Sequence, residues 1–195
     1  MSGNRKSIRL KKYDYSQVGL YYVTICAEKH KCLFGQIKEA QMILNTYGEM
    51  MKNIWEDNPK HYKGIDVDLF QIMPNHIHGI IQIIDKDENT EDDKNEKFGI
   101  NKHKNTDVGA GFPCPFESEG RGNRAPTLGQ IIAYFKYVST KQINNIFKTP
   151  GVRLWQRNFY EHIIRNEEEL NRIREYISIN PEKWEDDEYF MGEYG

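Results

Sequence analysis

The residues of this chain with the clearest chemical potential are two histidines one position apart, His76 and His78, in the passage IMPNHIHGIIQII. On a β-strand, side chains alternate between faces, so both imidazoles project to one side, with backbone positions roughly 6.5 Å apart. The pair stands at the N-terminal end of an otherwise apolar strand, where burying two imidazoles without partners would be costly. The spacing therefore predicts two ligands of a metal ion, with an ordinary pair of structural histidines as the alternative.

A third ligand and a nucleophile are both available near the C-terminal end of the chain. Tyr176 and Asn180 are four residues apart, so they lie on one face of a predicted helix. An amide oxygen is a hard metal ligand, and a phenol one turn away is a nucleophile. The alternative is that Asn180 simply caps the end of the helix. Tyr176 would then be one of the 12 tyrosines of the chain, without a catalytic role.

The elements that must position these residues follow from the apolar periodicity of the sequence. Thr127 with Gln130, and Asn166 with Glu169, are typical of helix starts, and a Pro74-Asn75 turn predicts a hairpin before His76. Strands are predicted over 20–27, 32–37, 41–44, 65–73, 76–84, 152–155 and 159–165, and helices over 46–55, 127–147 and 166–180. This order predicts an α+β sandwich, an antiparallel sheet covered by helices.

The length of 195 residues favours a single domain over 1–195. From 85 to 126 the apolar pattern gives way to charge, Asn, Gly and Pro, and we interpret this stretch as a flexible insertion within one fold.

Charge is unevenly distributed although the formal net charge is only -2. Residues 1–38 carry eight Lys or Arg against two acids, and 128–165 carry six against Glu161 alone. These clusters indicate a phosphate-binding surface or ordinary solvated faces, while the acids of 85–96 and from Glu182 onward are expected to form surfaces of their own.

Three cysteines without metal-binding spacing give no sign of a disulfide framework or a Cys-rich zinc site. No stretch approaches the about 20 apolar residues of a membrane span, and no signal-type segment follows the basic start. A soluble, cytoplasmic protein is expected.

Four passages in order resemble the HUH-type single-tyrosine transposases of small insertion sequences, and most closely the REP-associated tyrosine transposases. They are KKYDYSQVGLYYVTI, LFQIMPNHIHGII, PTLGQIIAYFKYVSTKQIN and LWQRNFYEHIIRNEEELNRIREYISINPEKW. Together they cover nearly the whole chain apart from 85–126, a region that looks variable in the family.

The resemblance implies a ferredoxin-like fold, with helices on one side of a central antiparallel sheet. It assigns the histidine motif to His76 and His78, the nucleophile to Tyr176 and a polar metal ligand to Asn180. Tyr160 is the second candidate nucleophile. Glu161 and His162 also match the family, with a structural role at least as plausible as an accessory catalytic one.

The implied activity is metal-dependent cleavage and strand transfer of single-stranded DNA, through a 5′-phosphotyrosine intermediate and near a DNA hairpin. The resemblance implies Mg or Mn, whereas imidazole ligands in general favour softer ions such as Zn or Ni. Trp155 or Phe159 could stack on a base, although a core position is the commoner role of a tryptophan. The expected phosphate contacts are Arg5, Lys12, Lys136, Lys141, Arg153 and Arg157.

Alternatives remain open at the level of sequence. A replication initiator or relaxase would use the same histidines and tyrosine. A regulatory DNA-binding protein would retain these residues without catalytic function. A small zinc hydrolase would use the histidines with a water nucleophile. A monomer and a homodimer are both compatible with the sequence, as is a tyrosine that acts on its own or on a partner's histidines.

Overall fold

A computed structural model describes residues 14–84, 126–190 and 192, and its elements follow the predicted order. The strands are β1 (Gly19–Cys26), β2 (Gly35–Lys38), β3 (Gln41–Leu44), β4 (Ile65–Ile72), β5 (His76–Ile83) and β6 (Tyr160–Ile164). The helices are α1 (Thr46–Glu56), α2 (Asn58–His61), α3 (Leu128–Ile146) and α4 (Glu167–Ile179), with short 3₁₀ segments η1 (Glu28–His30) and η2 (Trp184–Asp186).

The main sheet has the strand order β4-β5-β1-β6 and is antiparallel throughout, while β2 and β3 form a separate hairpin. Strands β4 and β5 make the hairpin predicted from the Pro74-Asn75 turn. The two histidines therefore lie at the start of an interior strand, where both edges of the backbone are hydrogen-bonded and the side chains are held in place. The predicted α+β class is confirmed.

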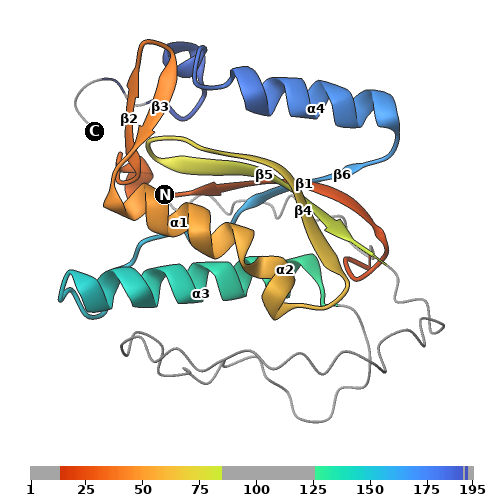
Figure 1. Ribbon diagram of the computed structural model, residues 1–195, viewed down its shortest axis with the longest axis horizontal. Coiled ribbons are helices and arrows are strands. Elements are labelled where there is room, and N and C mark those ends of the chain that lie inside the picture. The colour runs from red at the N-terminus through yellow and green to blue at the C-terminus, as the bar shows by residue number, and fades with distance from the viewer. Residues whose placement is uncertain (1–13, 85–125, 191, 193–195) are drawn as a thin grey trace, which may run out of the picture.

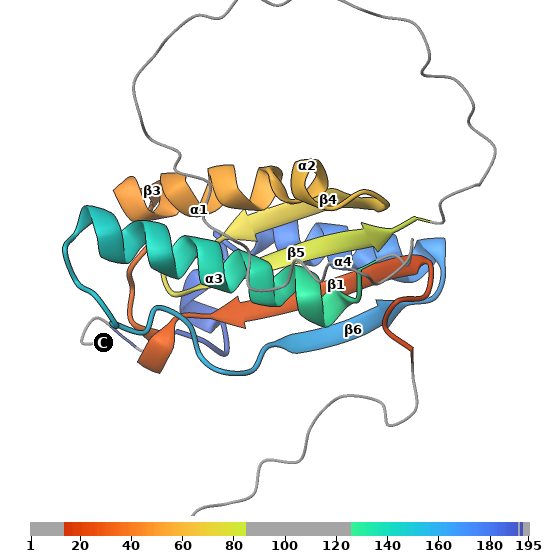
Figure 2. The same ribbon diagram turned by 90° about the horizontal axis from the view of Figure 1, so that it is seen from below.

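Helices cover both faces of this sheet (Figures 1 and 2). Helices α1 and α3 pack side by side on one face, over the β1 side chains of Tyr21, Val23 and Ile25. Helix α4 lies on the opposite face, where Leu170 and Ile177 belong to a second apolar cluster. The expectation of helices on one side is therefore wrong, because Tyr22, Ile80 and Ile164 form an apolar patch on the second face of the sheet as well.

Gly79 explains how β5 can pack closely against α1. A Cβ atom built at this position would lie 2.4 Å from Cζ2 of the Trp55 ring, closer than real contacts allow. The absence of a side chain lets Trp55 lie against the strand between the positions of His78 and Ile80. The strand that carries the histidines is thereby fixed from the face opposite to them.

Several predicted boundaries differ from the structure. Strand β2 begins at Gly35, not near Cys32, and the stretch 152–155 contributes only an isolated bridge between Trp155 and Ala27. A short helix, α2, follows α1 because Pro59 is favourable in a first helical turn. The predicted insertion lies outside the described residues except for Pro126. Within the described ranges no helix has the length and apolarity to cross a membrane.

Candidate active site

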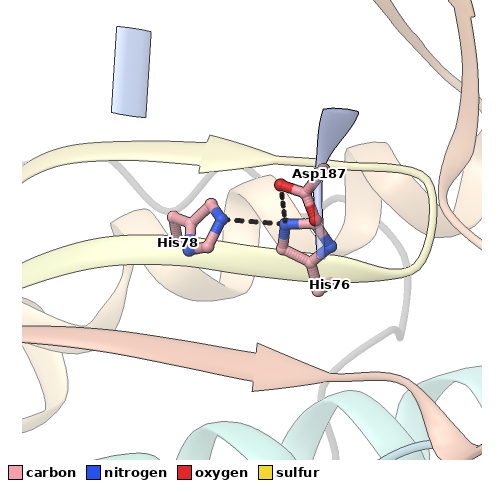
Figure 3. A group of neighbouring side chains, drawn as sticks. All are labelled: His76, His78 and Asp187. Atoms are coloured by element: carbon pink, nitrogen blue, oxygen red, sulfur yellow. Dashed lines mark hydrogen bonds and ion pairs between the residues drawn. The ribbon is translucent and has the colours of Figure 1, made fainter. Parts of the chain in front are cut away.

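His76 and His78 are buried next to one another on the α4 face of the sheet. Their Nε2 atoms are 2.9 Å apart, and their ring centroids are separated by 4.4 Å (Figure 3). Burial is the main cause that lowers the pKa of both imidazoles below the ordinary value, so both rings are neutral at physiological pH. The predicted convergence of the two rings is present.

Asn75 fixes the protonation of the His76 ring. The Asn75 amide donates through Nδ2 to the backbone carbonyls of His30 and Tyr189, so its Oδ1 atom faces Nδ1 of His76 at 2.8 Å as an acceptor. The His76 proton is therefore on Nδ1, and the lone pair on Nε2 points toward His78 and the space beside it. A neutral imidazole held in this way is a competent metal ligand.

The His78 ring is held from strand β1. Its Nδ1 atom lies 2.8 Å from the hydroxyl of Tyr22 and 2.9 Å from Oγ1 of Thr24, the residue paired with it across the sheet. Both hydroxyl groups are buried with it. Neither contact was predicted from sequence, because the β1–β5 register that creates them joins segments far apart in the chain.

Asp187 is a third ionisable group at the histidine pair (Figure 3). Its Oδ2 atom is 4.0 Å from Nε2 of His76, and ligand atoms of the three residues lie within 4.8 Å of one another. Its carboxylate accepts hydrogen bonds from Nδ2 of Asn180 and from the backbone N–H of Tyr189, and its side chain is 1% exposed.

The acidic tail predicted from Glu182 onward therefore does not form only an outer surface, since Asp187 turns inward. No spacing in the sequence relates this residue to the histidines. In the sequence Asp187 is one of 29 acidic side chains, and its residue type does not distinguish it from the others.

Asn180 ends α4 beside this cluster and is only 3% exposed. Its Oδ1 atom is buried and has no hydrogen-bond partner among the described residues. A buried amide oxygen without a partner is costly unless another group satisfies it. The two imidazole nitrogens and the Asp187 carboxylate form a donor set that fits a divalent cation, and Asn180 borders it through the hydrogen bond from its Nδ2 to Asp187.

Tyr176 is the exposed member of the group, one turn before Asn180 on α4. Its side chain is 41% exposed, and its ring lies 5.3 Å from that of His78 and 6.4 Å from that of Tyr22. Partial burial raises the pKa of the Tyr176 phenol, and the nearby Asp187 and Glu188 raise it further. Side-chain hydrogen bonds with Asn180 and Tyr22 act in the opposite direction. The phenol thus faces both solvent and the donor cluster.

A cavity of about 590 Å³ opens in front of Tyr176, between α4 and the strands β1 and β6. Tyr160, the second candidate nucleophile, also lines it and is 38% exposed, with its ring 6.0 Å from Tyr22. The remaining wall contains Tyr22, Thr24, His162, Glu169, Arg172, Ile173, Glu188 and Tyr189.

The two family-matched residues of β6 lie on different faces. His162 lines the cavity, and its Nε2 atom is 2.8 Å from a carboxylate oxygen of Glu169. Glu161 is buried and pairs with Val23, whose side chain belongs to the core beneath α1 and α3. Of the two, only His162 is placed to meet a ligand in this cavity.

A second cavity, of about 580 Å³, brings together four of the predicted basic residues. Lys136 donates from Nζ to the carbonyls of Gln156 and Asn158, which ties α3 to the segment before β6. The lining residues are Lys136, Tyr137, Thr140, Lys141, Arg153, Trp155, Gln156 and Arg157.

Trp155 belongs to the core, since it is 3% exposed and donates its indole N–H to Ser139. Phe159 is partly buried against the same core. Arg5 and Lys12 lie outside the described residues.

Comparison with known proteins gives two sequence relatives, both from Haemophilus influenzae strain Rd, while no family model matches. An uncharacterized protein is 36% identical over 197 residues, which cover 96% of this chain and 94% of the relative. A protein named "Putative REP-associated tyrosine transposase" is 24% identical over 178 residues, which cover 87% of this chain and 74% of the relative. The resemblance predicted from the four sequence passages is confirmed.

Two solved structures are also similar to this chain. A REP-associated tyrosine transposase bound to a REP hairpin has a TM-score of 0.49 and 16% identity, and the match covers 92% of this chain and 74% of that one. A "putative transposase" from Deinococcus radiodurans has a TM-score of 0.43 and 13% identity, with 88% and 96% covered.

Proposed function

This chain belongs to the family of the uncharacterized Haemophilus influenzae protein and is related to a REP-associated tyrosine transposase, and we propose that it cleaves and rejoins single-stranded DNA through Tyr176. The observation that carries the proposal is the position of a solvent-facing phenol beside a buried set of metal donors. Tyr176 contacts the ring of His78, and the partnerless oxygen of Asn180 lies one helical turn away.

The proposed donors of a divalent ion are Nε2 of His76, Nε2 of His78 and Oδ1 of Asn180, with Asp187 as a further ligand. An ion bound there would supply Lewis acidity toward a non-bridging oxygen of the scissile phosphate. Mg or Mn fits the oxygen donors Asn180 and Asp187, whereas the two imidazoles also accommodate Zn. The adduct assay distinguishes these ions, because each is supplied in a separate reaction.

Tyr176 supplies the nucleophile. Its oxygen forms a bond to phosphorus, the bond from phosphorus to the 3′ oxygen breaks, and that oxygen leaves as a 3′-hydroxyl after it takes up a proton. The phenol loses its own proton, and the DNA remains attached as a 5′-phosphotyrosine. One phosphodiester bond replaces another, so a second 3′-hydroxyl can reverse the step without ATP.

The proposed substrate is single-stranded DNA beside a hairpin, as the family resemblance implies. The basic cavity lined by Lys136, Lys141, Arg153 and Arg157 offers cations for the phosphate backbone. Tyr160 lines the cavity before Tyr176 and is 38% exposed, so its ring could stack on an unpaired base. The proposal treats 1–195 as one transposase-like domain that carries an insertion over 85–126.

The test is formation of a covalent protein–DNA adduct. The full chain is incubated with hairpin oligonucleotides that carry single-stranded flanks and a label at the 3′ end, in separate reactions with Mg, Mn, Zn, Ni or EDTA. Wild-type protein and Tyr160→Phe should give a labelled species that survives denaturing electrophoresis, while Tyr176→Phe and His76→Ala should give none. Tyr160→Phe is the matched control, because it makes the same change in the same cavity.

An adduct that persists in Tyr176→Phe and disappears in Tyr160→Phe would transfer the nucleophile to Tyr160. No adduct with any ion and any hairpin would contradict strand transfer altogether. Hairpin binding without cleavage would then favour a regulatory DNA-binding protein.

A second candidate, a hydrolase that activates water, is favoured by one observation. Asp187 completes a His-His-Asp set, and three protein ligands with a water molecule are typical of catalytic zinc sites. That protein would cleave DNA with Zn in Tyr176→Phe as fast as in wild type, and no adduct would form in either. The same gel therefore distinguishes the two candidates.

A further inference from the structure

Two arginines of helix α4 lie two positions apart and serve different surroundings. Arg174 pairs with Asp68 of the edge strand β4 through Nε and Nη2. Arg172 instead lines the cavity in front of Tyr176, between α4 and the strands β1 and β6. Within the described parts of the chain, no hydrogen bond or ion pair involves the Arg172 guanidinium. This group is therefore available to a ligand that enters the cavity.

Arg172 stands one helical turn before Tyr176 on α4. Residues four apart share a face of a helix, and their backbone positions are separated by about 6 Å along the axis. Side chains of a helix lean toward its N-terminus, so the Tyr176 phenol leans toward the turn that carries Arg172. Adjacent phosphates of a single DNA strand have a comparable separation. A strand that runs along α4 with one phosphate at Tyr176 therefore brings the next phosphate to Arg172.

The charges around the cavity favour an anion at this position. Among the described residues that line it, Arg172 is the only one with a permanent positive charge. The Glu169 carboxylate also lines the cavity, but Oε1 lies 2.8 Å from Nε2 of His162 and Oε2 accepts from the backbone N–H of Arg165. The other lining carboxylate, Glu188, belongs to the segment that follows α4. A phosphate that enters beside α4 thus meets a guanidinium whose donors are not engaged by either acid.

We propose that Arg172 forms a subsite for the phosphate adjacent to the scissile one, so that the single strand runs along α4 from Tyr176 toward Arg172. The guanidinium fork matches two oxygens of a phosphate group and holds the strand in register with the nucleophile. The inference rests on the proposed function for the presence of single-stranded DNA in this cavity. It is separate from the basic cavity beside α3, whose lining does not include Arg172.

The first test measures the affinity of the full chain for hairpin oligonucleotides with single-stranded flanks, by fluorescence anisotropy in EDTA. Arg172→Gln should weaken binding about tenfold, as expected for a lost hydrogen-bonded ion pair. The slope of log K against log salt should decrease by about 0.7, the value for one phosphate of a single strand. Arg172→Lys, which keeps the charge, should bind within about threefold of wild type. Arg165→Gln is the matched control, because Arg165 is exposed and lines neither cavity.

The second test locates the contact on the DNA. Methylphosphonate linkages, which carry no negative charge, replace the phosphates on either side of the cleaved linkage one at a time, and the adduct assay identifies that linkage. Wild type and Arg165→Gln should lose affinity when the linkage next to the cleaved one is neutral. Arg172→Gln should bind this oligonucleotide and the unmodified one alike, because the cation that interacts with the charge is absent.

Equal affinities of Arg172→Gln and Arg165→Gln would overturn the subsite. An Arg172→Gln protein that keeps the full response to every methylphosphonate would also overturn it, as would a response that is lost only at a linkage remote from the cleaved one. Absence of an adduct in wild type would contradict the proposed function alone. The subsite is then supported by a methylphosphonate effect that is confined to one linkage and depends on Arg172, and it is overturned if no linkage shows such an effect.

Discussion

At the scale of residues, the partners of each histidine matter more than the His-x-His spacing. Asn75 sets His76 as an acceptor at Nε2, and Tyr22 and Thr24 hold His78 from the neighbouring strand. Two neutral imidazoles with opposed Nε2 atoms are prepared for a shared ion and need no large rearrangement. Because burial disfavours the charged form of both rings, it also lowers the stability of the folded protein at low pH.

The metal-free protein should lose stability as the pH falls below about 6.5. The folded-state pKa of His76 is lowered to about 3 by burial and that of His78 well below its ordinary value, so the unfolded chain binds more protons in this range. Each histidine should reduce the free energy of unfolding by up to about 1.4 kcal/mol per pH unit between about pH 6 and 4.

Denaturant unfolding in EDTA at several pH values checks this, with His78→Gln as the comparison. The variant should show a shallower decline than wild type. A wild-type stability that stays flat, or that rises as the pH falls to 4, would contradict the depressed pKa values.

Asp187 should contribute directly to metal affinity. Asp187→Asn removes the carboxylate while it keeps the shape of the side chain, and we expect Mn affinity to fall about tenfold to a hundredfold by calorimetry. Asp186→Asn, at the exposed neighbouring position, is the control and should bind Mn like wild type. Unchanged or tighter binding in Asp187→Asn would show that the carboxylate blocks the ion site instead of completing it.

At the scale of elements, the position of α4 decides whether Tyr176 meets the histidines. Leu170 and Ile177 bury one side of the helix against the sheet, and Arg174 pairs with Asp68 through Nε and Nη2. Asp68 lies in β4 where a bulge between Val67 and Phe70 interrupts the pairing with β5. The irregularity of the strand thus provides the anchor for the helix two residues before the nucleophile.

Breaking this anchor should affect chemistry more than stability. The pair is partly exposed, so Arg174→Gln should cost only about 0.2–1 kcal/mol in the free energy of unfolding. Adduct formation should fall about tenfold or more, because small displacements of a nucleophile are expensive. The double variant Asp68→Asn with Arg174→Gln should be no slower than Arg174→Gln alone, and Glu168→Gln on the same helix is the control. Additive losses in the double variant would contradict a shared anchoring role.

At the scale of the whole molecule there are two cavities, one lined by α4, β1 and β6 and the other by α3 and the segment before β6. One contains the candidate nucleophile, and the other gathers Lys136, Lys141, Arg153 and Arg157. A DNA chain that extends from the cleaved phosphate would gain affinity from the basic cavity without any contribution to the chemical step. Affinity and cleavage should therefore be separable by mutation.

Arg153→Gln and Arg157→Gln should each weaken hairpin binding for all sequences alike. The slope of log K against log salt should decrease by about 0.7 to 0.9 for each cation that contacts a phosphate. Fluorescence anisotropy over a range of NaCl concentrations measures this, with Lys63→Gln, an exposed cation outside the cavity, as control. An unchanged slope in both arginine variants would exclude the basic cavity from the DNA path.

Tyr176 contacts the rings of Tyr22 and His78 of its own chain, and we expect the tyrosine to act together with these histidines and not with those of a partner. A mixture of Tyr176→Phe and His76→Ala proteins should therefore form no more adduct than either alone. Recovery of adduct on mixing would show that α4 acts on the histidines of a partner. The measurement is the denaturing gel described above, with both proteins at equal concentration.

The sequence by itself determined the local features of this protein. The capping box at Thr127, the Asn166 cap and the hairpin before His76 depend on neighbouring residues, and the structure confirms each. The same holds for the common face of His76 and His78, because alternation along a strand is a local rule. The resemblance added the α4 residues, although their roles remain proposals.

Only the tertiary structure decided which distant groups surround the histidines. The β1–β5 register brings Thr24 opposite His78, and the turn of the chain after α4 places Asp187 beside His76. Helix α4 covers the face opposite α1 and α3 because Tyr22, Ile80 and Ile164 form an apolar patch there, which the order of elements alone does not reveal. Such contacts depend on packing between segments far apart in sequence, and no short-range pattern encodes them.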